Sequence, residues 1–267
     1  MRSSFLLAAF AAFTPAIKGL NVLITNDDGF GVANIRELYK QMTGLGHNCY
    51  IVASPSALSS TSDQTMFTTS PKLLIDGDWG LTKAGAPSLG TDPHDGHIWY
   101  YNGTPAAQVF IALDYVLPKF AGFSQPDLVI SGPNFGWNLG PFVYTMTGNL
   151  GASYAAIERG IPAISFASGN NVPEPYYWVN TTTEAGLEDP STITARLAAG
   201  LVQALADKAS GSRVMPKGYG MSVNLPYITS YKDDQCTNPP FVLARMVTNI
   251  TDDKAVFDSS TGLFTYG

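Results

Sequence analysis

Charged residues are scarce in this chain, and clustered basic residues are missing. Charged side chains make up 13% of its 267 residues, with 15 Lys and Arg against 21 Asp and Glu and a formal net charge of −6. Binding to a nucleic-acid duplex depends on grouped basic side chains that neutralise phosphates, and no basic run occurs. A nucleic-acid partner is therefore not expected, although acidity of this size also fits simple solubility.

Long apolar runs are also few. Outside the first residues no segment has the roughly 20 continuous apolar residues that cross a bilayer, so we expect no membrane span. Met1-Arg2, an apolar run over residues 5–13 and small residues up to Gly19 form the pattern of a secretory signal peptide. We expect residues 1–19 to be removed and the protein to be secreted; cleavage after Ala16 fits the pattern equally well.

Cysteine is rare, with only Cys49 and Cys236. An oxidising compartment would allow them to pair, but two separate thiols fit the sequence as well, and spacing does not decide. Three glycosylation sequons agree with export, although chance supplies some in any chain of this length. They begin at Asn102, Asn180 and Asn249.

A hydrophobic content of 45% with 26 Gly and 18 Pro indicates one globular domain over residues 20–267. Strand and helix patterns alternate with short links, which predicts an α/β fold with a mainly parallel sheet. Expected strands cover residues 22–25, 49–53, 127–131, 163–167, 219–225 and 241–247, and expected helices cover 35–42, 105–117, 152–159 and 190–205. Residues 64–102 are expected to form a β-rich excursion from this sheet, with strand patterns at 72–75 and 98–101.

The first strand leads directly into Asn26, Asp27 and Asp28, and Gly29 turns the chain toward a helix. Ligands of open α/β sheets bind at the carboxyl ends of the strands. Two adjacent carboxylates repel each other, and a hard divalent cation such as Mg²⁺ or Mn²⁺ would satisfy both. The alternative is that Asp28 caps the following helix, and the pair alone does not decide between the two.

Three further loops follow strands or precede a helix, over residues 54–63, 132–140 and 145–151. They carry Ser60, Asn134, Asn138, Thr147, Gly148 and Asn149. The last loop opens a helix whose first N–H groups could bind a phosphate, while the absence of Lys and of Walker spacing excludes a P-loop. A hard cation beside an anion-binding loop is what phosphate-ester hydrolysis needs, since charge develops on the phosphoryl oxygens.

His94-Asp95-Gly96-His97 is a second stretch with metal-binding residue types. It has one carboxylate and no second cluster nearby in sequence, which favours an ordinary surface loop. The histidines are therefore not assigned to the site.

In combination, four motifs resemble the SurE (survival protein E) family of nucleotidases and phosphatases over about residues 21–226, and the signal peptide makes the chain similar to its secreted fungal acid phosphatases. The motifs are Asn26-Asp27-Asp28-Gly29, the serine-rich loop of residues 54–63, Ser131-Gly132-x-Asn134-x-Gly136-x-Asn138-Leu139-Gly140 and Gly160-x-Pro162-Ala163. The resemblance implies a Rossmann-like three-layer α/β core with a mainly parallel sheet and a β-rich extension. It also implies hydrolysis of small phosphomonoesters such as nucleoside monophosphates with a divalent metal, and a homo-oligomer formed by exchange of C-terminal arms, although residues after Pro226 do not match clearly.

By position, the resemblance implies two groups of site residues. The metal ligands would be Asp27, Asp28, Ser60 and Asn134, and the phosphate contacts would be Asn138, Thr147, Gly148 and Asn149. Asp27, Asp28 and Asn138 would be catalytic, with the carboxylates orienting a metal-activated water and Asn138 holding a phosphoryl oxygen.

The chain departs from the family pattern around this set. Thr61, Ala107, Asn149 and Ala155 stand where the family usually has Gly, Asp, Thr and Glu. The metal set is intact, so activity is better supported than substrate identity. A secreted protein that binds metal or a phosphoryl ligand without turnover is the alternative, and a nucleotide-sugar transferase is disfavoured because residues 190–267 show no second nucleotide-binding half.

Overall fold

The computed structural model describes residues 19–244 and 255–266. Residues 1–18 of the expected signal peptide and the sequon at Asn249 lie outside the described residues. In the described part, no helix is both long and apolar enough to cross a membrane.

A seven-stranded sheet organises the molecule in the order β3-β4-β2-β1-β5-β6-β7. Strand β1 (Asn21–Thr25) lies at its centre and pairs in parallel with β2 (Asn48–Ala53) and β5 (Leu128–Phe135). Strands β4 (Asp95–Tyr101), β6 (Ala163–Ser168) and β7 (Gly220–Asn224) extend the parallel pairing, and only β3 (Leu89–Asp92) is antiparallel. The predicted α/β architecture with a mainly parallel sheet is confirmed.

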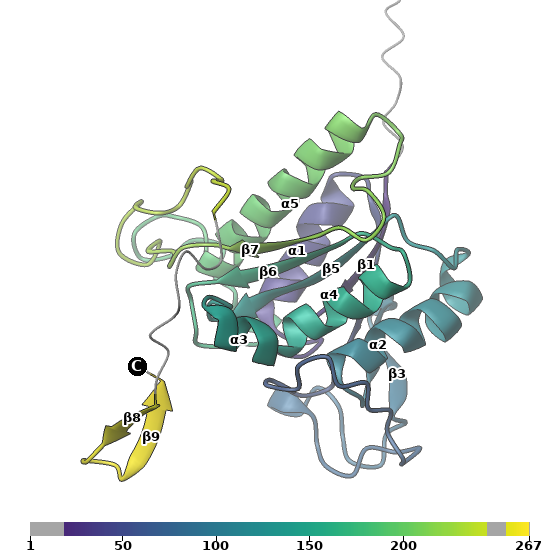
Figure 1. Ribbon diagram of the computed structural model, residues 1–267, viewed down its shortest axis with the longest axis horizontal. Coiled ribbons are helices and arrows are strands. Elements are labelled where there is room, and N and C mark those ends of the chain that lie inside the picture. Colours follow the sequence, from purple (N-terminus) through teal and green to yellow (C-terminus); the bar gives the residue numbers. More distant parts are fainter. Residues whose placement is uncertain (1–18, 245–254, 267) are drawn as a thin grey trace, which may run out of the picture.

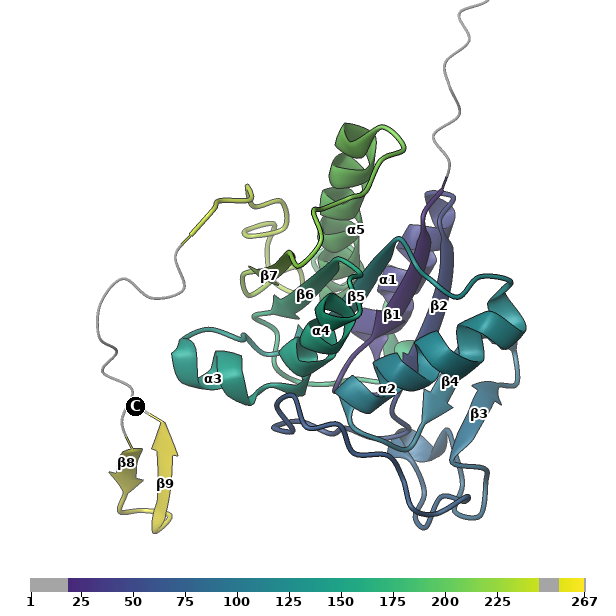
Figure 2. The same ribbon diagram turned by 45° about the vertical axis from the view of Figure 1, so that its right-hand side comes forward.

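Helices cover both faces of the sheet and make three layers (Figure 1 and Figure 2). One face packs against α1 (Ala33–Gly44) and α5 (Pro190–Ala209), and the other against α2 (Pro105–Ile111) and α4 (Gly148–Glu158). Side chains alternate along a strand, so in β1 Ile24 enters the first core and Leu23 the second. Both faces of β1 are therefore buried, which explains why its three central residues, Val22 to Ile24, are all apolar.

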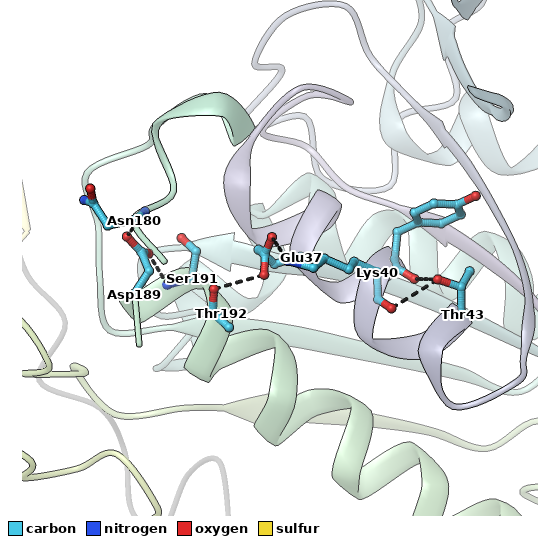
Figure 3. Close-up of polar contacts among 8 residues, drawn as sticks. Glu37, Lys40, Thr43, Asn180, Asp189, Ser191 and Thr192 are labelled. Atoms are coloured by element: carbon cyan, nitrogen blue, oxygen red, sulfur yellow. Dashed lines mark hydrogen bonds and ion pairs between the residues drawn. The ribbon is translucent and has the colours of Figure 1, made fainter. Parts of the chain in front are cut away.

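Polar contacts join the start of α5 to α1 (Figure 3). Asp189 caps α5 by accepting a hydrogen bond from the Ser191 N–H at 2.8 Å, and its other oxygen accepts one from the Asn180 N–H at 3.1 Å. Thr192 Oγ1 donates to Glu37 Oε2 at 2.9 Å. The Asp189 contacts fix the start of α5, and the Thr192–Glu37 hydrogen bond joins α5 to α1.

Two expectations for residues 64–102 need correction. Strands β3 and β4 belong to the main sheet, with β4 directly beside β2, so residues 89–101 complete the sheet edge, whereas residues 64–88 form no strand and lie outside the sheet. Residues 72–75 form no strand: Lys72 makes one isolated bridge to Pro87, while Leu74 and Ile75 are 78% and 74% exposed. Without a partner strand, an alternating pattern has no ladder to join.

The helix that begins at Pro105 does not end at Pro118. Helix α2 continues as the π-helix η2 (Ala112–Ala121), which contains Pro118 and stops at Gly122 with φ 75°. Proline has no N–H to donate, so the helix continues past Pro118 with one backbone hydrogen bond fewer.

The strand expected over residues 241–247 is not found in residues 241–244, so the prediction is wrong there. Residues 245–247 lie outside the described residues. Strands β8 (Ala255–Asp258) and β9 (Leu263–Tyr266) pair only with each other among the described strands.

Two other features of the sequence have ordinary environments in the structure. Cys49 is buried and Cys236 exposed, and both thiols are free. In the His94–His97 stretch, Asp95 accepts a hydrogen bond from the Tyr39 hydroxyl and His97 stacks on Tyr50. These are ordinary structural contacts.

Candidate active site

The chain turns sharply after β1 and separates the two aspartates. Asn26 Oδ1 accepts a hydrogen bond from the Gly29 N–H at 3.0 Å, and Gly29 has a φ of 112°, which glycine adopts without strain. Helix α1 begins four residues later, and its N-cap is Val32 with no side-chain cap. The helix-capping alternative for Asp28 is therefore excluded.

The two carboxylates face different elements. Asp28 Oδ2 accepts a hydrogen bond from the Phe135 N–H at the end of β5, at 2.9 Å. Asp27 Oδ2 accepts hydrogen bonds from Thr147 Oγ1 at 3.3 Å and from the Asn149 N–H at 3.2 Å. Asp27 Oδ1 is buried and has no hydrogen-bond partner, and neither carboxylate has an ion pair within the described chain.

Burial dominates the electrostatics of this pair. Desolvation raises the pKa of Asp27 to about 6, against the opposing effect of its hydrogen bonds. The pKa of Asp28 is raised well above its usual range, first by burial and then by the charge of Asp27. Two buried carboxylates without a basic partner are costly when both are ionised, so the arrangement favours a cation between them and the pocket.

Glycines bring the serine-rich loop against the start of α4. A Cβ on Gly148 would lie 2.7 Å from Thr61 Oγ1, and one on Gly151 would lie 1.9 Å from the Ser62 carbonyl oxygen. The Ser62 N–H also donates to the Met146 carbonyl at 2.9 Å. This contact holds Ser60, exposed and with a φ of 62°, at the rim of the site.

The extension of β5 supplies the amides. Asn134 Nδ2 donates to the Gly136 carbonyl at 2.8 Å. The side-chain oxygen of Asn134, Oδ1, accepts no hydrogen bond from the described residues. The Asn138 N–H donates to Asn224 Oδ1 at 2.8 Å, and Asn138 Nδ2 is buried with no hydrogen-bond partner among the residues that the structure describes. Asn138 therefore presents a buried, unused donor.

These elements enclose one pocket of about 200 Å³. Of the predicted site residues, Asp27, Ser60, Asn134, Asn138 and Thr147 line it. Asp28, Gly148 and Asn149 do not line it, although Asp28 is hydrogen-bonded to lining residue Phe135 and the other two follow Thr147. Residues about 120 positions apart in the chain thus meet at one sheet edge.

Asn149 plays a different part from the one predicted. Its side chain accepts from Ser131 Oγ at 2.5 Å and donates to Ser165 Oγ and to the Phe166 carbonyl, both at 2.9 Å. It is completely buried, and its own N–H is directed at Asp27. Its side chain therefore fastens α4 to β5 and β6 and is unavailable to a ligand.

Two residues at the site were not predicted from the sequence. Asn224, at the end of β7, holds the Asn138 backbone, and Trp137 lines the pocket. Asn224 could have been found by the rule that strand carboxyl ends carry the site, because its strand was expected to end at residue 225. Trp137 lies between two predicted motif residues, and nothing in its own sequence environment marks it.

The residues present fit a hard divalent cation. Asp27 offers an unpartnered buried oxygen, Asn134 a free carbonyl oxygen and Ser60 a hydroxyl, and oxygen ligands are those that Mg²⁺ and Mn²⁺ take. No group of three or more His, Cys, Asp or Glu that could hold a metal occurs among the described residues. Any cation here would depend on two carboxylates supplemented by neutral oxygens and solvent.

A family model described as SurE: Survival protein SurE matches residues 22–252. The chain belongs to the SurE family. An acid phosphatase of Yarrowia lipolytica is 39% identical over 92% of this chain and 68% of its own length. A 5'-nucleotidase SurE of Protochlamydia amoebophila is 29% identical over 60% of this chain and 54% of its own length, so the chain spans about half of that relative.

The fold agrees with this assignment. The crystal structure of SurE from Aquifex aeolicus superposes with a TM-score of 0.61 over 92% of this chain and 81% of that one, at 20% sequence identity. This likeness confirms the SurE-like three-layer architecture implied by the motifs.

Proposed function

We propose that this chain is a divalent-metal-dependent phosphomonoesterase of the acid phosphatase or 5'- or 3'-nucleotidase type, acting on small substrates such as nucleoside monophosphates. The names of its SurE relatives support the reaction class, since acid phosphatases and 5'-nucleotidases hydrolyse phosphoric monoesters. The observation that carries the proposal is the pair of unsatisfied buried atoms at one pocket, Asp27 Oδ1 and Asn138 Nδ2. One suits a cation and the other suits a phosphoryl oxygen.

Asp27, Asp28, Ser60 and Asn134 would hold Mg²⁺ or Mn²⁺. When bound, such an ion would supply an activated water and offset negative charge on the phosphoryl group. Thr147 Oγ1 and the Asn149 N–H orient Asp27 through its second oxygen, which leaves Oδ1 directed away from them. The Phe135 N–H orients Asp28 in the same way.

Asn138 is the donor for the phosphoryl group. Asn224 fixes the Asn138 backbone, and the Asn138 side-chain oxygen accepts a hydrogen bond from Asn134 Nδ2 at 3.5 Å. Its Nδ2 is therefore positioned before a substrate arrives, and a positioned donor costs no reorganisation when charge develops. Thr147 lines the pocket beside it, and Gly148, which follows Thr147, is a further proposed phosphate contact. The Asn149 side chain holds this segment against β5 and β6 and does not contact the phosphate in this proposal.

Hydrolysis of p-nitrophenyl phosphate across pH 4–8, with Mn²⁺ and with chelator, tests the proposal. Turnover that is lost on chelation and restored by Mn²⁺ or Mg²⁺ is the expected result. Absence of metal-dependent turnover, together with retained binding of Mn²⁺, would instead favour the non-catalytic binding protein.

Export and self-association are part of the same proposal. Asn180 is exposed, as a glycosylated sequon requires, whereas Asn102 is half-buried and the hydroxyl of its sequon residue Thr104 is buried in hydrogen bonds with the backbone of residues 64 and 66. The hairpin β8–β9 exposes Phe257 and Phe264, which fits an arm that docks on another subunit. Glycosidase-sensitive mass in the culture medium and light scattering test the two expectations.

A further inference from the structure

Trp137 stands at the mouth of the pocket as a fixed aromatic wall. Its side chain lines the pocket and is 48% exposed, so part of the indole faces the site and part faces solvent. The indole Nε1–H donates to the Leu225 carbonyl at 2.6 Å, which fixes the ring orientation. The next residue, Asn138, is held by Asn224, so the end of β7 anchors both the phosphate donor and the indole.

The size of the pocket indicates what it encloses. About 200 Å³ is smaller than the 300–1,000 Å³ of sites that enclose a whole drug-sized ligand. It suits a phosphoryl group and its cation and leaves the rest of the ester at the rim. The group attached to the phosphate therefore meets the residues of the rim.

The lining residues indicate which group suits that rim. Phe135, Val143, Met146 and Trp137 supply apolar surface, and among the described residues no Lys, Arg or His lines the pocket. A second or third phosphate would find no basic side chain in this lining, whereas a flat aromatic group would find an indole held ready for stacking.

We propose that Trp137 is a specificity-determining residue that stacks on an aromatic part of the leaving group, such as the base of a nucleoside or the ring of a phenol, and so favours aromatic over aliphatic phosphomonoesters. This inference rests on the proposed phosphomonoesterase function. The Trp137 contact is made by the part of the substrate that is not reacting, so it acts on binding more than on the chemical step.

Adenosine 5'-monophosphate and ribose 5-phosphate form a matched substrate pair, because they share the sugar phosphate and differ in the base. In Trp137→Ala we expect kcat/KM for the adenosine ester to fall about tenfold, mainly through KM, from the loss of stacking. Activity on ribose 5-phosphate is expected to stay within about twofold. Trp137→Phe, which keeps an aromatic face but loses the N–H, should retain most of the preference.

Trp178→Ala is the matched control, because Trp178 is 59% exposed and does not line the pocket. Calorimetric titration with adenosine and with ribose, neither of which can be hydrolysed as a phosphomonoester, separates stacking from turnover. Wild type should bind adenosine more tightly than ribose, and Trp137→Ala should lose that difference. Equal losses on both esters in the Ala and Phe variants would make Trp137 only an anchor and overturn the proposal while the phosphatase function stands. Inactivity of wild type on every ester would instead refute the function, with the titration still deciding the stacking.

Discussion

Replacing Asp28 by Asn removes one charge and little else. The Asn carbonyl oxygen can still accept the Phe135 N–H that Asp28 Oδ2 now accepts at 2.9 Å, and the two side chains have the same shape. We expect at least a hundredfold loss of phosphomonoesterase activity, about 2.7 kcal/mol of barrier, because the cation would lose one of only two carboxylates. Asp28→Asn should fold normally, because removing a buried charge next to Asp27 relieves repulsion.

Thermal unfolding with and without Mn²⁺ measures the same interaction without turnover. At a Mn²⁺ concentration about 100 times the Kd, wild type should gain about 2.7 kcal/mol, or roughly 5 to 10 °C in Tm for a domain of this size. If Asp28→Asn weakens binding about hundredfold, the same concentration adds only about 0.4 kcal/mol, or about 1 to 2 °C.

Asp114→Asn is the control for a lost aspartate, since Asp114 is exposed, paired with Arg159 and not among the residues that line the pocket. It should keep wild-type activity and the full Mn²⁺ shift in Tm. A variant Asp28→Asn that keeps activity within about threefold, or that shows the wild-type Mn²⁺ shift, would refute the assignment of Asp28 to a cation site.

Three further outcomes follow from the structure. Asn138→Ala should lower kcat about a hundredfold with an unchanged circular dichroism spectrum, since one preorganised donor is lost; a loss confined to KM would contradict that role. Asn149→Ala removes three buried side-chain hydrogen bonds and should lower the free energy of unfolding by about 3 kcal/mol, and a change in activity without a change in denaturant midpoint would argue against its supporting role. In the native protein only Cys236 should react quickly with a thiol reagent, because burial raises the pKa of Cys49 to about 12; two fast thiols before denaturation would disprove this burial.

Local sequence determined the central strand and the turn that follows it. The apolar residues of β1 could only be buried on both faces, and Asn26 with Gly29 makes a turn from short-range contacts alone. The alternation of strands and helices then required parallel pairing, which places strand carboxyl ends together. For this reason Asp27 and Asn134 could be assigned to one site before any distance was known.

Tertiary structure decided which atoms of those residues are free. The sequence could not show that the Asn149 side chain hydrogen-bonds to β5 and β6, or that only one carboxylate oxygen of Asp27 has a hydrogen-bond partner among the described residues. The Asn149 contacts join segments 16 to 18 residues apart, and the Asp27 contacts join segments 120 and 122 residues apart, so both depend on how separate elements pack. The same holds for Trp137, whose position at the pocket is set by a hydrogen bond to the end of β7, because no local pattern encodes a contact across 88 residues.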